Sequence, residues 1–98
     1  MEIIKTLEDK KLTITLKGEL NSATYQALEE VVGNSLNGIE ALVFDFAELS
    51  YISSAGLRVL LVAKKIMDKQ GTMVVRHVNS DIMDIFDITG FATILDIE

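Results

Sequence analysis

The sequence predicts an α/β fold, with a mixed sheet of four or five strands covered by helices. Residues 11–17 alternate strictly between polar and apolar side chains, a pattern typical of a half-buried strand. The short apolar runs 41–46 and 73–78 have the length and the β-branched content of buried strands. Because a long helical stretch separates these two runs, a right-handed parallel crossover is expected between them.

The first third of the chain predicts a hairpin followed by a helix. A weaker strand candidate over 2–7 precedes the alternating strand, and a short polar connection between the two suits an antiparallel hairpin. Asn21-Ser22 can then cap a helix that Gly33 weakens and Gly38 ends. The apolar stripe of that helix consists of Tyr25, Leu28, Val32 and Leu36.

The second half of the chain predicts two further helices and a last strand. The longest helix is expected over 54–70, with Gly71 as its C-terminal cap. Residues 79–81 cap a short helix that stops at Gly90, and 91–97 follows as the last strand. The side chains expected to face inward from the short helix are Ile82, Ile85 and Phe86. The resulting order is β-β-α-β-α-β-α-β.

Length and composition limit what the protein can be. A chain of 98 residues with 49% hydrophobic content can bury one core but not two, so we expect 1–98 to form a single domain. With no cysteine and only one histidine, His77, we expect neither a disulfide, nor a metal site, nor a cofactor. The net charge of -6 repels phosphate backbones, so nucleic acid is not an expected partner.

Membrane insertion and catalysis are also not expected. No apolar run approaches the roughly 20 residues that cross a bilayer, and the start of the chain lacks a signal-peptide core. We therefore expect a cytoplasmic protein. The chain contains no Gly-x-Ser-x-Gly elbow and no Walker loop, and His77 is interpreted as a strand residue. The acids Asp81, Asp84 and Asp87 are interpreted as a solvated face rather than a metal site.

Residues 45–58 join the third strand to the longest helix, at the edge of the sheet where binding sites collect in α/β folds. Ser53 is expected to cap this helix, and Ser54 to point outward at its first position. A plainer interpretation is that both serines only cap the helix. The spacing i, i+4, i+7 and i+11 places four residues on one helix face, an arrangement that favours an interaction surface although the leucine can equally turn into the core. These residues are Ser54, Arg58, Leu61 and Lys65.

Residues 49–57, Leu-Ser-Tyr-Ile-Ser-Ser-Ala-Gly-Leu, resemble the phosphorylation-site loop of STAS-domain anti-sigma-factor antagonists. The resemblance covers the whole chain. Residues 18–21 resemble the Gly-Glu-Leu-Asp turn of that family, 71–75 resemble the entry to its fourth strand, and 86–91 are similar to its last helix-to-strand junction. The resemblance implies a STAS fold, a four- to five-stranded mixed sheet with helices packed mainly on one side.

The resemblance further implies a function in partner binding rather than catalysis. Unphosphorylated protein would bind an anti-sigma factor with serine-kinase activity, and that partner would phosphorylate Ser54, with a PP2C-type serine phosphatase reversing the step. Sigma-factor-dependent transcription would thereby be regulated. An alternative within the same fold is a STAS subunit of a membrane transport complex, which binds its ATPase without phosphorylation. The partner-binding residues implied are Asn21, Ser22, Ser53, Ser54, Gly56, Arg58 and Leu61.

This sequence departs from the family pattern at Asn21 and Ser53, where Asp is common, and at Ala47, where a hydroxyl is frequent. Ser53 is therefore a second candidate acceptor. A phosphate on Ser54 adds about -1.5 to -2 charges at a helix N-terminus, which tolerates an anion, so the fold should survive while the partner is released. Asn21 and Ser22 are expected beside these serines, although Asn21 can equally be a simple cap.

Overall fold

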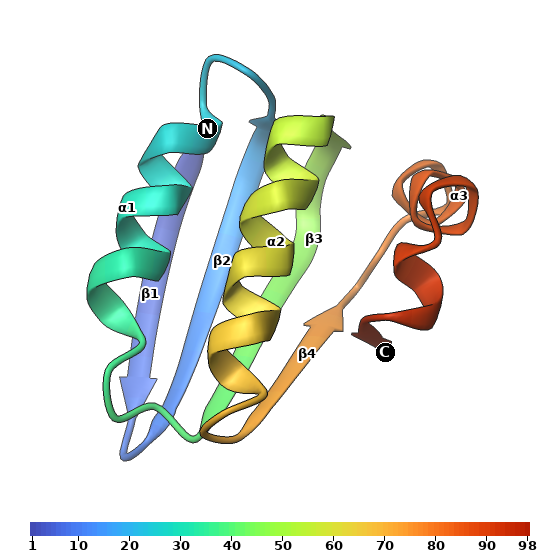
Figure 1. Ribbon diagram of the computed structural model, residues 1–98. Coiled ribbons are helices and arrows are strands. Elements are labelled where there is room, and N and C mark those ends of the chain that lie inside the picture. The colour runs from blue at the N-terminus through green and yellow to red at the C-terminus, as the bar shows by residue number, and fades with distance from the viewer.

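Five strands form one mixed sheet in the order β1-β2-β3-β4-β5 (Figure 1). The first pair is antiparallel and the other three neighbouring pairs are parallel. The computed structural model describes residues 1–98, and its element order confirms the predicted β-β-α-β-α-β-α-β fold. The strands are β1 (Glu2–Glu8), β2 (Lys11–Leu20), β3 (Ala41–Ile52), β4 (Thr72–Arg76) and β5 (Asp96–Ile97).

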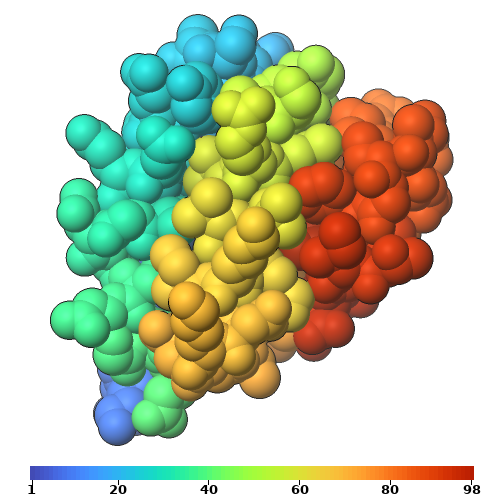
Figure 2. All heavy atoms as spheres, viewed as in Figure 1, coloured from blue at the N-terminus to red at the C-terminus, as the bar shows by residue number.

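Three helices cover one face of this sheet. In Figure 1, α1 and α2 run side by side across β1 to β3, and α3 lies beyond β4 near the C-terminus. The space-filling view shows the same arrangement as three adjoining ridges (Figure 2). The helices are α1 (Tyr25–Ser35), α2 (Ser54–Met67) and α3 (Ser80–Thr89), and a short 3-10 helix, η1 (Phe91–Thr93), follows the last of them.

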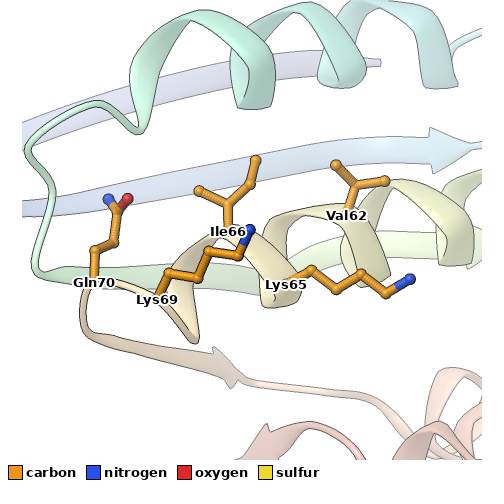
Figure 3. Close-up of a pocket in the computed structure, with 5 residues that line it drawn as sticks. All are labelled: Val62, Lys65, Ile66, Lys69 and Gln70. Carbon is orange, nitrogen blue, oxygen red and sulfur yellow. The ribbon is translucent and has the colours of Figure 1, made fainter.

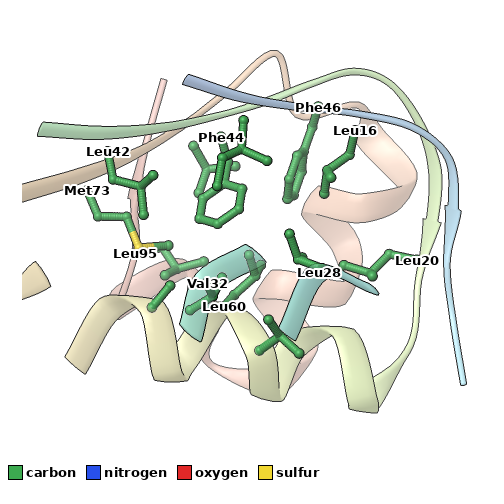
Figure 4. Close-up of a cluster of buried hydrophobic side chains, with 14 of the residues drawn as sticks. Leu16, Leu20, Leu28, Val32, Leu42, Phe44, Phe46, Leu60, Met73 and Leu95 are labelled. Atoms are coloured by element: carbon green, nitrogen blue, oxygen red, sulfur yellow. The ribbon is translucent and has the colours of Figure 1, made fainter. Parts of the chain in front are cut away.

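The core lies between the sheet and the helices (Figure 4). The alternating residues Leu12, Ile14 and Leu16 of β2 are all buried, as their pattern predicts. Phe44 and Phe46 of β3 meet edge to face with ring centroids 6.1 Å apart, and Phe46 reaches Phe86 of α3 at 6.5 Å. One apolar cluster therefore holds all three helices against the sheet.

The main difference from the predicted elements is the length of β3. This strand runs to Ile52, whereas a strand was expected only over 41–46, followed by a connection to the longest helix. Its register against β2 shifts between Thr15 and Lys17 and again between Gly18 and Glu19. Each shift inserts one extra residue into β3, and each insertion reverses which side chains face the core. The sequence of β3 therefore shows no continuous alternation.

Four further boundaries differ from prediction. Helix α1 ends at Ser35, before the Gly38 that was expected to end it, and α2 ends at Met67 rather than at residue 70. Gly71 is not a left-handed cap: a Cβ there would overlap the carbonyl oxygen of Glu40, so the residue is small to let two backbones approach. Strand β4 ends at Arg76, because the next residue has a φ of 59°. Most of 91–97 is helical or irregular, and only Asp96–Ile97 pairs with β4.

The ends of α3 agree with prediction. Asn79 is its N-cap, with Oδ1 accepting a hydrogen bond from the Ile82 backbone N–H at 2.9 Å. Gly90 ends the helix with a φ of 83°, a left-handed conformation that glycine adopts without steric cost. Both signals are local, and both place a helix end correctly.

Candidate functional site

The candidate site lies where β2 and β3 end and α2 begins, at the upper edge of the sheet in Figure 1. The last paired residues of the two strands are Leu20 and Ile52. Beyond them, the Ser53 backbone N–H donates to the Leu20 carbonyl oxygen at 2.8 Å. This bond continues the ladder by one residue, so Asn21-Ser22 and Ser53-Ser54 lie on the same edge, as the parallel order predicts.

Ser53 is the N-cap of α2. It has extended backbone geometry, and its Oγ accepts from the Gly56 backbone N–H at 3.3 Å. Its carbonyl oxygen also accepts from the Leu57 backbone N–H at 2.9 Å. The predicted capping role of Ser53 is thus confirmed, and its hydroxyl oxygen is already engaged in the helix terminus.

Ser54 is the first residue of α2 and is exposed, as expected. The first turn of α2 contains no acidic side chain. The unpaired backbone N–H groups of that turn and the helix dipole give the site a positive character. A hydroxyl at this position can therefore accept an anionic group without meeting a neighbouring carboxylate within its own turn.

Asn21 closes a turn rather than capping α1. Its Oδ1 accepts from the backbone N–H groups of Ala23 at 2.9 Å and Thr24 at 3.2 Å. Thr24 is the residue that precedes α1, and it makes no side-chain cap. Its Oγ1 instead donates to the Glu19 carbonyl oxygen at 2.8 Å. The predicted cap is therefore wrong in position, because the local bonds of the asparagine stabilise a turn before the helix.

Ser22 is exposed at the tip of that turn, whereas Asn21 is half-buried within it. Thr24, which sequence reasoning missed, fixes the turn by accepting from the Asn21 backbone N–H at 2.8 Å. This pair of reciprocal bonds holds the segment after β2 in one shape. The Ser22 hydroxyl is therefore carried by a turn that these hydrogen bonds hold in place.

Gly56 is buried, which corrects its expected place on the partner surface. A Cβ on Gly56 would lie 2.7 Å from Cγ of Leu20 and 3.0 Å from Cγ1 of Ile52. Its small size lets the first turn of α2 pack directly on the ends of β2 and β3. We assign this residue to packing instead of binding.

The predicted helix face is present with one half-buried member. Arg58 and Lys65 are exposed, and Leu61 is half-buried between the surface and the core. Two exposed side chains were missed: Tyr51, with 46% of its surface accessible, and Val62, with 45%. Because both side chains are largely apolar, the sequence suggests that they belong to the core. The bulge in β3 exposes Tyr51, and the packing of α2 exposes Val62.

A side-chain hydrogen bond joins β3 to the segment after β4. His77 Nδ1 lies 2.9 Å from Asp45 Oδ1, and the same oxygen accepts from the Ala47 backbone N–H at 3.0 Å. The hydrogen bond from His77 lowers the pKa of Asp45 below its ordinary value, with partial burial acting in the opposite direction. His77 was expected within a strand and instead follows one. It connects the middle of β3 to the residue that directly follows β4.

The remaining sequence expectations concern metals and membranes. The acids of α3 are exposed, in agreement with a solvated face. No three His, Cys, Asp or Glu side chains are grouped so that they could hold a metal ion. None of the helices combines the length and the apolar character that crossing a membrane requires.

The chain resembles known proteins in sequence and in structure. The family model of the STAS domain matches residues 2–98. BtrV of Bordetella bronchiseptica, a protein named as an anti-sigma factor antagonist, is 40% identical over 91 residues, covering 91% of this chain and 78% of its own. An anti-sigma factor antagonist from Mycobacterium paratuberculosis has a similar structure, with a TM-score of 0.88, 21% identity, and 98% and 83% of the two chains covered. SpoIIAA of Bacillus in its phosphorylated form gives a TM-score of 0.78 at 14% identity, covering 99% and 91%.

Proposed function

The chain belongs to the STAS domain family, and from this premise we propose that it is an anti-sigma factor antagonist that works by reversible binding to an anti-sigma factor. Two findings support the proposal. The curated relative at 40% identity carries that name, and the phosphorylated form of a structural relative is known. The observation that carries the mechanism is the exposed Ser54 hydroxyl at the first position of α2.

The partner in this proposal is an anti-sigma factor that is also a serine kinase. It binds the unphosphorylated protein at the edge formed by Ser22, Ser54 and the exposed face of α2. The Ser54 oxygen then attacks the terminal phosphorus of ATP held by the partner, the bond to the bridging oxygen of ADP breaks, and the hydroxyl proton passes to a base of the kinase. A PP2C-type phosphatase restores the hydroxyl by hydrolysis.

Ser54 is the preferred acceptor over Ser53 for a geometric reason. Ser53 is half-buried, and its Oγ accepts from the Gly56 N–H, so attack by this oxygen requires loss of the cap. Ser54 is exposed and can enter the active site of a kinase while α2 stays intact. The structure of the helix terminus therefore favours the second serine of the pair.

Phosphorylation on Ser54 acts on the surface rather than on the fold. The phosphate adds about -1.5 to -2 charges beside backbone N–H groups that tolerate them. A partner packed on this helix end must then desolvate the phosphate or meet it with its own acidic groups. Either cost can exceed the few kcal/mol of a strong interface contact. Release of the anti-sigma factor follows.

The test is phosphate mapping with matched variants. Wild type, Ser53→Ala and Ser54→Ala are incubated with the candidate kinase and ATP, and the label is located by mass spectrometry. We expect label on Ser54 in wild type and in Ser53→Ala, and none in Ser54→Ala. Label on Ser53 alone moves the switch by one residue. Absence of label on both serines, together with tight binding to a transporter ATPase, replaces this function with that of a transport-complex subunit.

A further inference from the structure

One stripe along α2 and the turn after it carries only positive charge although the whole chain is acidic, and the neighbouring carboxylate of Asp68 pairs with Lys64. Arg58, Val62, Lys65 and Lys69 are spaced i, i+4, i+7 and i+11 and are all exposed, whereas the net charge of the chain is -6. The ion pairs of the molecule engage Lys10, Lys17, Lys64 and Arg76, and none engages a cation of this stripe. Three positive charges therefore face solvent without a carboxylate partner.

The lower half of this stripe borders an open groove of about 240 Å³. Figure 3 shows Val62 and Ile66 pointing to the same side of α2, toward α1, with the long side chains of Lys65 and Lys69 beside them. Gln70 closes the end of the groove. Its Nε2 donates to the carbonyl oxygens of Leu36 at 2.6 Å and Ile39 at 2.7 Å, which fixes the wall to the segment after α1.

We propose that this groove docks an acidic amphipathic segment of the anti-sigma factor, with an apolar side chain over Val62 and Ile66 and carboxylates facing Lys65 and Lys69. The inference rests on the proposed function and extends its interface from the Ser54 end to the other half of α2. Charge complementarity selects the occupant, because unpaired cations beside an apolar floor match alternating carboxylate and apolar side chains. Three cations on an acidic protein are too few for a phosphate backbone, which typically engages about six to ten.

The distance between the two surfaces is compatible with one partner. Ser54 and Lys65 are eleven residues apart, which corresponds to about 16 Å along a helix. A standard interface buries about 800 Å² on each protein, enough to cover both ends of α2. This separation also exceeds the screening length of about 8 Å at physiological salt, so phosphate on Ser54 leaves the docking charges unaffected. Release of the partner therefore depends on the Ser54 end of α2 rather than on a change in the groove.

The test compares two charge reversals on opposite faces of the molecule. Lys65→Glu changes the docking stripe. The control, Lys11→Glu, lies at an exposed position of β2 that makes no ion pair. Each reversal removes one positive and adds one negative charge, so both variants change the net charge from -6 to -8. Binding of each unmodified protein to the anti-sigma factor is measured at low and at physiological salt. Thermal melting checks that both variants are folded.

We expect Lys65→Glu to reduce the association rate and the affinity by about 10-fold at low salt, and Lys11→Glu to reduce them far less. Equal losses in both variants, or no loss in either, overturn the docking site while leaving the proposed function in place. Self-association of the wild type that Lys65→Glu abolishes assigns the groove to a second copy of the chain, which also overturns it. If wild type does not bind the anti-sigma factor, the proposed function fails first.

Discussion

The two ends of α2 differ in chemistry although they belong to one rigid helix. The N-terminal end presents hydroxyl and amide groups, from Ser53, Ser54 and the turn at Asn21, and has no charged side chain in its first turn. The C-terminal half presents Lys64 and Lys65 in the last turn. The helix dipole favours anions at the first end and cations at the second. The N-terminal end can therefore gain negative charge by phosphorylation, whereas the C-terminal half carries a constant positive charge.

Glycines next to the two ends offer the largest effects on stability. Gly71→Ala places a Cβ into the backbone of Glu40, which cannot rotate away, and we expect a loss of about 1–3 kcal/mol in the free energy of unfolding. Gly56→Ala meets the side chains of Leu20 and Ile52, which can shift, and it also gains helix propensity of about 1 kcal/mol. Urea unfolding of both variants measures the difference. An equal or larger loss of unfolding free energy in Gly56→Ala contradicts the view that only Gly71 packs against a rigid backbone, whereas Gly56 packs against side chains that can move.

Loss of the Ser53 hydroxyl separates capping from modification at the N-terminal end. Ser53→Ala removes the acceptor for the Gly56 N–H, and we expect a decrease of about 1 kcal/mol in the free energy of unfolding. Phosphorylation of Ser54 should continue, since its hydroxyl is not part of this bond. Denaturant unfolding and phosphate incorporation are measured on the same sample. A variant of unchanged stability shows that the cap bond contributes nothing.

A negative charge at the first position of α2 is expected to stabilise the fold slightly and to weaken binding. Ser54→Asp brings a carboxylate to the positive end of the dipole and should add roughly 0.3–1 kcal/mol of stability. Its affinity for the anti-sigma factor should fall, though less than after phosphorylation, because phosphate carries more charge. Ser54→Ala is the matched control and should bind as wild type does. If Ser54→Asp both melts at a lower temperature and binds more weakly, its loss of affinity is due to unfolding and not to the added charge.

The smallest effect is expected outside α2, at the pair of Asp45 and His77. Because the folded pKa of Asp45 is lowered, its contribution to stability is present above the unfolded pKa and is lost as pH falls through the folded value. His77→Asn removes the imidazole but tolerates the positive φ, and should raise the pKa of Asp45. Carbon-13 NMR titration of the carboxyl group measures it. The stability difference near pH 7 should stay below about 1 kcal/mol, as for other partly exposed pairs.

Local signals in the sequence identified much of the fold and the local structure around Ser53 and Ser54. The alternation of β2, the cap at Ser53 and the helix stop at Gly90 each depend on a few neighbouring residues, and each was predicted correctly. The continuation of β3 and the exposure of Tyr51 depend on two register shifts against a partner strand, which no local pattern encodes. The groove at Val62 likewise depends on a tertiary contact, because Gln70 at its end is held by the carbonyl oxygens of Leu36 and Ile39.

The central claim is that the modifiable end of α2 controls binding, and one measurement tests it most directly. The affinity of the anti-sigma factor is determined for unmodified protein and for protein phosphorylated on Ser54, with the phosphate position verified by mass spectrometry. We predict tight binding of the unmodified form and at least a tenfold weaker complex after phosphorylation, since one unfavourable desolvated charge costs more than about 1.4 kcal/mol. Equal affinity of the two forms contradicts the account.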